Sequence, residues 1–357
     1  MSIWRWADWL APIAPEFRIS LGEGNTPLVR SRSIGPKAGL RNLFYKLDSV
    51  NPTGSYKDRF AVTAVSHLRA TGRSRCLATS SGNTGAALAA YCAAAGLACE
   101  IAIVETAPID KLKQMLAYGA TLYRVRGFGL DPDITSRVFA QLQRRGERHD
   151  TLLLISAYRY APSGMSGVET ISFELAEQTD QPIQHVFCCA GGGGLALGVA
   201  RGFARLNKER KIDYRPAVQC VQPAGNATIA GPLRAGASHA VAVTCTTTVS
   251  GLQVPNVIDG DDALLECRIS GGTGHLVDDE FVWDVQRRLA CEEGIFCEPA
   301  AAVPLAGALQ ARSEGLLGAD ATVVCLVTGT GFKDAHGVDR MITDRSCPLI
   351  ELSEMAN

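Results

Sequence analysis

The sequence predicts an α/β protein with open, mostly parallel sheets that carry helices on both faces. Short apolar segments alternate along the chain with longer segments of helical periodicity. The strand candidates are apolar throughout rather than alternating, which is typical of strands buried on both faces. Polar and glycine-rich loops follow several of these strands, at the sheet edge where ligands bind in such folds.

The elements follow one another in a regular order. An arm rich in Trp and Pro extends to Ser20, and a turn-rich loop follows at residues 22–28. Segment 237–251, rich in Thr, Ser and Ala, fits neither pattern. The predicted strands are 43–47, 75–79, 100–104, 121–125, 152–156, 185–189, 217–221 and 322–327. The clearest helices are 84–95, 107–118, 132–145 and 278–293.

Composition excludes several classes of function. The chain has 357 residues and a formal net charge of -1, so no electrostatic argument favours nucleic acid or an anionic membrane surface. The first residues show no signal-peptide pattern, and no uncharged run is long enough to span a bilayer. We therefore expect a cytoplasmic protein that acts on a small molecule, with no nucleic-acid or membrane partner.

The twelve cysteines are predicted to be small buried hydrophobic residues rather than disulfides. No Cys-x-x-Cys pair occurs and the histidines are scattered, so the sequence gives little support for a metal site. Cys291 and Cys297 flank a turn at Gly294 and could meet in space, where we expect a structural role. The clearest buried candidates are Cys76, Cys99, Cys188, Cys189, Cys220 and Cys325.

Lys57 lies where a loop becomes a helix, after Pro52 and Gly54 have ended a strand. Backbone N–H groups and the helix dipole make such a position positive, which disfavours an ammonium group. A partly neutral lysine would be a nucleophile. Alternatively, Ser55 caps the helix and Lys57 extends into solvent.

The strand at 75–79 is followed by a polar run that opens the next helix. Its hydroxyl, amide and backbone N–H groups suit a carboxylate, although the same residue types also form capping turns. The run comprises Ser80, Ser81, Gly82, Asn83, Thr84 and Gly85.

Four consecutive glycines follow the strand at 185–189 and precede another helix. Such a run costs backbone entropy, and it lets N–H groups approach a phosphate. It also matches the dinucleotide pattern, but the next strand ends in Gln222 and Pro223 without the acid that binds a ribose, and the Walker lysine is absent. The loop therefore predicts a site for a single phosphate.

The last predicted strand ends at Thr328, which offers a hydroxyl among glycines. Glu298 precedes Pro299 at the start of another helix. It is either a site residue or a charge that favours the helix N-terminus.

Together, a junction lysine, an anion loop, a phosphate loop and a strand-end hydroxyl suit pyridoxal 5′-phosphate. The chain resembles the fold-type II pyridoxal-phosphate enzymes, which include the tryptophan synthase β subunit, and within them the threonine synthases. The resemblance covers nearly the whole chain. It is carried by the Leu21–Leu28 segment, the Asn51–Arg59 segment, the Ser80–Gly85 loop, the tetraglycine loop and the segment from Thr328 to Asp334.

The resemblance implies roles for individual residues. Lys57 would form the Schiff base, Asn83 would bind the ring hydroxyl and Thr328 would face the pyridine nitrogen. Ser80, Ser81 and Thr84 would hold the substrate carboxylate, and Arg159 is similar in position to an arginine that holds a substrate phosphate. The cofactor phosphate would bind at Gly191, Gly192, Gly193, Gly194 and Leu195.

The resemblance also implies two domains and a homodimer. Residues 1–77 and 158–357 would form a larger cofactor domain, residues 78–157 would form a smaller mobile substrate domain, and the active site would lie in the cleft between them. The implied reaction converts O-phospho-L-homoserine and water to L-threonine and phosphate.

Some segments depart from the threonine synthase pattern. The tetraglycine run is more similar to dehydratases and serine racemases, and the surroundings of Arg159 and the segment 249–255 are atypical. Deamination of serine, threonine or a related hydroxy amino acid, or replacement on O-phosphoserine, is the alternative.

Overall fold

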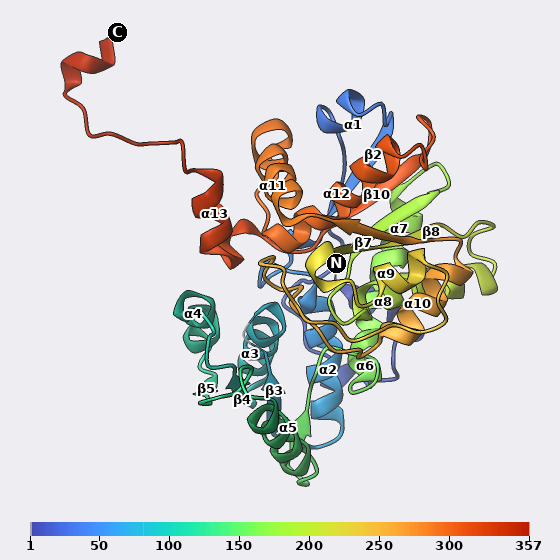
Figure 1. The fold of residues 1–357 in the computed structure, drawn as a ribbon. Coiled ribbons are helices and arrows are strands. Elements are labelled where there is room, and N and C mark those ends of the chain that lie inside the picture. Colours follow the sequence, from blue (N-terminus) through green and yellow to red (C-terminus); the bar gives the residue numbers. More distant parts are fainter. Residues whose placement is uncertain (1, 81, 357) are drawn as a thin grey trace.

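The computed structural model describes residues 2–80 and 82–356, and it has the predicted fold class. Two open, mostly parallel sheets are flanked by helices (Figure 1). The larger sheet has the order β1-β2-β10-β7-β8-β9, and only β1 pairs in the antiparallel sense. Its strands are β1 (Leu28–Arg30), β2 (Asn42–Leu47), β7 (His185–Cys189), β8 (Ala217–Pro223), β9 (Gly274–Val277) and β10 (Thr322–Val327).

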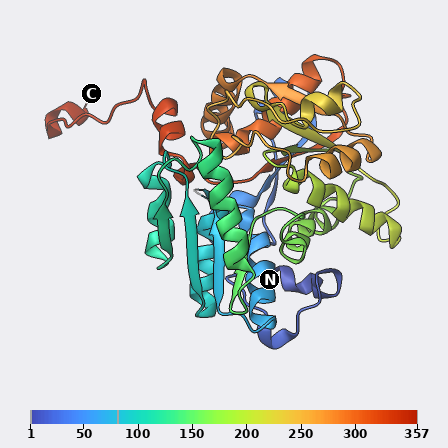
Figure 2. The ribbon, with the colours of Figure 1, turned by 60° about the horizontal axis from the view of Figure 1, so that its bottom comes forward.

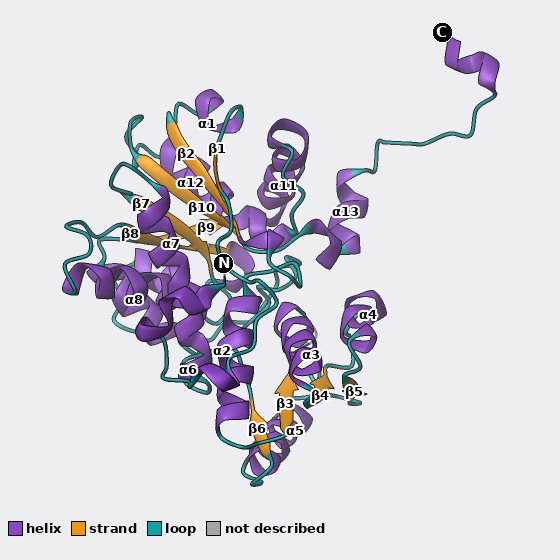
Figure 3. Cartoon of the chain, turned by 180° about the vertical axis from the view of Figure 1, so that it is seen from behind, coloured by secondary structure: helices purple, strands orange, loops and turns teal. Residues whose placement is uncertain are grey.

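The smaller sheet is built from one continuous part of the chain and is parallel throughout. Its order is β5-β4-β3-β6 (Figure 3 shows both sheets in orange). The strands are β3 (Arg75–Thr79), β4 (Ala98–Ile103), β5 (Thr121–Arg124) and β6 (Thr151–Leu153).

Helices connect the parallel strands. Those of the first half are α1 (Ile34–Lys37), α2 (Lys57–Ala70), α3 (Asn83–Ala95), α4 (Ile109–Ala117), α5 (Pro132–Gly146), α6 (Pro162–Met165) and α7 (Thr170–Gln178). Those of the second half are α8 (Gly194–Lys208), α9 (Ala230–Arg234), α10 (Gly260–Ile269), α11 (Asp279–Glu293), α12 (Pro299–Ser313) and α13 (Ala335–Met341).

Helices cover both faces of the larger sheet. Val221 in β8 packs against Gly307 of α12, where a Cβ on the glycine would come within 2.6 Å of the valine. The preceding residue of the strand, Cys220, points to the opposite face and lies near Cys267 of α10. Burial on both faces explains why these strands are apolar throughout.

Two strands were missed by the sequence analysis, and one was predicted too long. β1 has only three residues and lies at the sheet edge, and β9 contains Gly274 and His275, so neither has an extended apolar pattern. β6 ends at Leu153, whereas the prediction extended it to 156. Segment 237–251 contains no helix or strand.

The two ends of the chain differ. The N-terminal arm forms short 3-10 helices at Ile3–Trp9 and Pro15–Phe17, and the Trp6 ring lies 5.4 Å from that of Phe173. The C-terminal segment after α13 extends away from the body of the protein (Figures 1 and 2). Within the described residues, no helix is long and apolar enough to cross a bilayer.

The predicted division into two domains stays a prediction. Its boundary after residue 77 falls inside β3, which begins at Arg75 and pairs along its whole length within the smaller sheet. The segment that forms this sheet therefore begins before residue 78.

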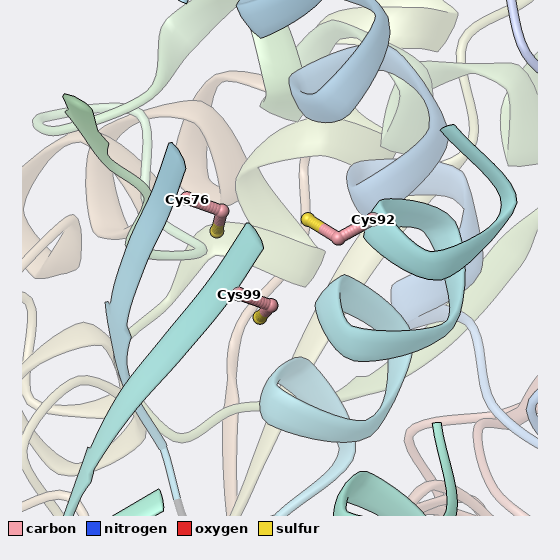
Figure 4. Close-up of side chains that lie close together, drawn as sticks. All are labelled: Cys76, Cys92 and Cys99. Atoms are coloured by element: carbon pink, nitrogen blue, oxygen red, sulfur yellow. The ribbon is translucent and has the colours of Figure 1, made fainter. Parts of the chain in front are cut away.

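The cysteines are free thiols, and the six named as buried candidates are buried. Cys291 is exposed and Cys297 is buried, so these two do not form a disulfide. Cys76, Cys92 and Cys99 converge in the core between β3, β4 and α3, with their sulfur atoms within 4.8 Å of one another (Figure 4). Sequence spacing could not predict this cluster, because Cys76 and Cys99 meet only through the pairing of β3 with β4.

Candidate active site

Lys57 is the first residue of α2, and its side chain turns inward. Its Nζ donates a hydrogen bond of 2.8 Å to Ser156 Oγ and lies 4.4 Å from the centre of the Tyr56 ring. Desolvation lowers the pKa of Lys57 to about 8, although the nearby Cys189, Asp259 and Glu298 act in the opposite direction. The alternative in which this lysine extends into solvent is therefore wrong.

The loop before Lys57 requires a glycine at position 54. Gly54 has a φ of +88°, and a Cβ there would lie 2.8 Å from Thr330 Cγ2. The Tyr56 N–H donates to the carbonyl of Thr328 at 2.9 Å. The lysine loop is thus attached directly to the end of β10.

Ser156, the partner of Lys57, was not singled out from the sequence. It lies three residues beyond the end of β6, at the carboxyl edge of the smaller sheet. The rule that ligands bind at strand ends applies to it as well, so this signal was available.

The glycine loop connects β7 to α8 through a tight turn. Gly193 has a φ of +97°, and a Cβ there would lie 3.0 Å from Ala263 Cβ. A Cβ on Gly191 would lie 3.0 Å from Val254, and one on Gly194 would lie 3.6 Å from the carbonyl of Ser156. The first N–H groups of α8, which include that of Leu195, have no acceptor within the helix and are available to an anion.

Asp259 was not predicted, and it supports this loop because its N–H donates to the carbonyl of Gly192 at 3.0 Å. It is buried, and its carboxylate accepts hydrogen bonds from the N–H groups of Tyr158, at 2.7 Å, and Arg159, at 3.1 Å. Burial raises its pKa above the usual value. The Arg159 side chain is exposed, so the structure positions this residue through its backbone.

Thr328 is buried at the end of β10. Its Oγ1 lies 3.8 Å from the sulfur of Cys189, the last residue of β7. The adjacent strands β10 and β7 therefore bring the strand-end hydroxyl next to the start of the glycine loop.

Asn83 begins α3, and its Nδ2 donates to Glu298 Oε1 at 2.8 Å. Ser80 lies half-buried before α3 and Thr84 lies half-buried in its first turn, whereas Ser81 lies outside the described residues. Glu298 is buried and contacts Asn83, which favours the first of the two roles that its sequence position allowed.

Polar contacts join α4 of the smaller sheet to loops of the larger one beside this site. Lys111 pairs with Asp334 at 2.8 Å and donates to Ser250. Gln114 donates to the carbonyl of Thr53 at 3.1 Å and accepts from Lys333 at 2.5 Å. Residues far apart in the sequence thus enclose one site between the two sheets.

The donor set fits pyridoxal 5′-phosphate. A partly neutral lysine, a glycine turn at a helix N-terminus, an amide and a buried strand-end hydroxyl lie on loops that contact one another. The family described as "Pyridoxal-phosphate dependent enzyme" matches residues 19–329. The chain belongs to this family. Its cofactor is accordingly pyridoxal 5′-phosphate.

Similar sequences in this family are threonine synthases. That of Methanocaldococcus jannaschii is 31% identical over 95% of this chain and 82% of the relative. That of Methanosarcina acetivorans is 32% identical over 94% and 81%, and that of Synechocystis sp. is 33% identical over 88% and 78%.

Solved structures with the same fold carry several other names. A fungal L-serine ammonia-lyase from Rhizomucor miehei has a TM-score of 0.75 at 21% identity and covers 90% of this chain and 99% of that one. Maize serine racemase has a TM-score of 0.73 at 24% identity, covering 94% of both chains. Threonine deaminase isoform 2 from Solanum lycopersicum has a TM-score of 0.73 at 21% identity, covering 90% and 88%. At these identities the likeness concerns the fold alone.

Proposed function

We propose that this enzyme converts O-phospho-L-homoserine and water to L-threonine and phosphate. One observation carries the proposal: threonine synthases from three organisms are 31–33% identical to this chain over most of its length. The solved structures with other activities reach only 21–24% identity.

In this proposal, Lys57 binds the cofactor covalently and later transfers protons. Pyridoxal phosphate, when bound, withdraws the negative charge that develops on substrate carbon atoms. Once the substrate amine has displaced Lys57, the Nζ of Lys57 removes and returns protons at the α and β carbons of the substrate. A pKa near 8 favours this role, because the amine can gain and lose a proton near neutral pH. Ser156 holds Nζ in place by its hydrogen bond.

The other residues hold the cofactor and the substrate. Gly191–Gly194 and Leu195 would bind the cofactor phosphate, Asn83 the ring hydroxyl and Thr328 the ring nitrogen. A hydroxyl at that nitrogen, unlike a carboxylate, would leave it uncharged and limit how much charge the ring withdraws.

Separate residues would bind the two charged groups of the substrate. Ser80, Ser81 and Thr84 would bind the substrate carboxylate, and Arg159 would bind its phosphate. The Arg159 side chain is exposed and therefore accessible to a substrate phosphate. The contacts of α4 with Ser250 and Thr53 support a cleft that closes over the substrate and excludes bulk water until the step that consumes a water molecule.

A product assay tests the reaction. The purified enzyme, loaded with the cofactor, is given O-phosphohomoserine, threonine or serine in separate reactions. We expect phosphate and threonine from the first and little keto acid from the others. Keto acid from serine or threonine, without phosphate release from O-phosphohomoserine, would refute the proposal.

The second candidate is an ammonia-lyase acting on serine, threonine or a related hydroxy amino acid, or an enzyme of replacement on O-phosphoserine. The tetraglycine loop, which is more similar to those of dehydratases and serine racemases, and the atypical surroundings of Arg159 favour it. The product assay, with O-phosphoserine added as a fourth substrate, separates these reactions. A homodimer and a cytoplasmic location stay predictions.

A further inference from the structure

The Glu298 side chain does not cap the helix that it precedes. It occupies the N-cap position of α12, where a carboxylate commonly accepts hydrogen bonds from the first N–H groups of the helix. Here the side chain makes no capping bond, and its Oε1 accepts from Asn83 instead. Glu298 is only 7% exposed, so its carboxylate has lost most of its hydration. A helix-end carboxylate that stayed in solvent would avoid this free-energy cost.

The neighbouring loop leaves room for this carboxylate. A Cβ on Gly329 would overlap Glu298 Oε1 and would lie 3.3 Å from Asn83 Nδ2. The Glu298 N–H donates to the carbonyl of Gly329 at 3.0 Å, which fixes the backbone beside Thr328. The carboxylate, the Asn83 amide and the end of β10 therefore form one contact cluster within the cofactor site.

Opposing effects act on the protonation of Glu298. Burial raises its pKa to about 7, while Asn83, Lys333 and Lys111 favour the carboxylate and Asp334 opposes it. On the cofactor side, Lys57, Tyr56 and Cys189 lie close enough for their pKa values to respond to Glu298, and Cys297 precedes it in the chain. The site thus contains a buried acid that loses its proton near neutral pH.

We propose that Glu298 is a positioning residue that acts on the cofactor through Asn83. An asparagine amide has two N–H donors. The carboxylate engages one and leaves the other for the ring hydroxyl, so the negative charge of Glu298 polarises the amide and favours the protonated form of the bound cofactor. The inference rests on the role proposed for Asn83 and does not depend on which reaction the enzyme catalyses.

A pH titration of the cofactor absorbance tests this role. The enzyme loaded with pyridoxal phosphate is titrated without substrate, and the midpoint between its protonated, longer-wavelength form and its neutral form is recorded. In Glu298→Gln we expect the midpoint to fall by about 1 pH unit, because a nearby negative charge has been removed. The matched control is Glu293→Gln, which removes a carboxylate that bonds Ser31 and the N–H of Ile34. Its midpoint should equal that of the wild type.

A second variant, Asn83→Ser, probes the same contact from its other partner, so the test does not depend on the folding of Glu298→Gln alone. Serine suits a helix start, and it disconnects the carboxylate from the cofactor. We expect the same fall of about 1 pH unit, and no further fall when Glu298→Gln is added to it. An unchanged midpoint in either single variant, or a full additional fall in the double variant, overturns the proposal. A protein that titrates as expected yet releases no phosphate from O-phosphohomoserine would refute the proposed reaction and leave this role intact.

Discussion

Lys57 and Arg59 lie two residues apart in the first turn of α2, but only the charge of Arg59 is paired with carboxylates of the described chain. Arg59 is fully buried, and it donates to Asp48 at 2.8 Å and to Glu174 at 2.7 Å. Burial alone would raise the pKa of Glu174, but Arg59 and Lys46 hold it well below its usual value. Lys57 has no carboxylate at bonding distance among the described residues, and its pKa falls.

The comparison separates a structural charge from a reactive one. The Arg59 network ties α2 to β2 through Lys46, to the loop at residues 22–28 through Thr26 and to α7 through Glu174. Its bonds compensate the charge and fix the start of the helix. With the helix fixed, Lys57 is held in a poorly solvated position where its charged form is disfavoured. The paired charge of Arg59 thus fixes the helix start that holds the unpaired Lys57.

The largest expected effect is that of Lys57→Ala. Without the amine, the enzyme should lose covalent attachment of the cofactor and about 10³-fold or more of its turnover. Visible absorbance and phosphate release measure these losses, and the unfolding free energy should change little. Lys113→Ala removes a largely exposed lysine of α4 and is the control. An aldimine absorbance band that persisted in Lys57→Ala would show that another amine binds the cofactor covalently.

Arg59→Met should instead act on stability. It leaves Asp48 and Glu174 buried with less compensation, so we expect the free energy of unfolding to fall by about 3–5 kcal/mol. Urea denaturation of the cofactor-free protein measures this loss. Arg137→Met, on the exposed surface of α5, should stay within about 0.5 kcal/mol of the wild type. Equal stability of the two variants would mean that the network is not what holds the start of α2.

Within the glycine loop, Gly193→Ala should weaken cofactor binding about tenfold. Its φ of +97° strains any side chain, at a cost of about 1–3 kcal/mol. Gly192→Ala is the matched control, because its φ is ordinary and its Cβ would meet Ile258 at 3.3 Å. Cofactor affinity, measured by fluorescence titration, should fall less in the control. The opposite order would contradict the backbone argument.

The smallest effect concerns pH. Because the pKa of Lys57 is lowered to about 8, its neutral, reactive fraction should rise steeply as the pH increases through 8. Labelling of the cofactor-free protein with an amine reagent, followed by peptide mass spectrometry, should show about a tenfold gain at Lys57 between pH 7 and 9 and little further gain above pH 9, where an ordinary lysine with a pKa of about 10.4 still gains. Lys113 supplies the reference curve of an exposed lysine. Labelling of Lys57 and Lys113 with the same dependence on pH would contradict the prediction. Desolvation would then not be the property that makes Lys57, unlike Arg59, reactive.

The fold class and the main loops were predictable because each has a local signature. Apolar runs gave β2, β3, β7 and β10, and glycine and polar residues marked the loops that follow them. Neither β1 nor β9 has such a signature, because both are short and form only when a neighbouring strand supplies their hydrogen bonds.

What the sequence by itself determined is the set of chemical groups at strand ends: the lysine, the glycine loop, the polar run and Thr328. Tertiary structure alone decided their electrostatics. It brought Ser156 to Lys57, joined Asp259 to the glycine loop at Gly192 and turned Glu298 towards Asn83. Burial and partners from distant segments set the charge of each group, and linear spacing carries no information about either. For the same reason, Lys57 and Arg59 are both cations in the sequence, and only the fold makes one of them reactive.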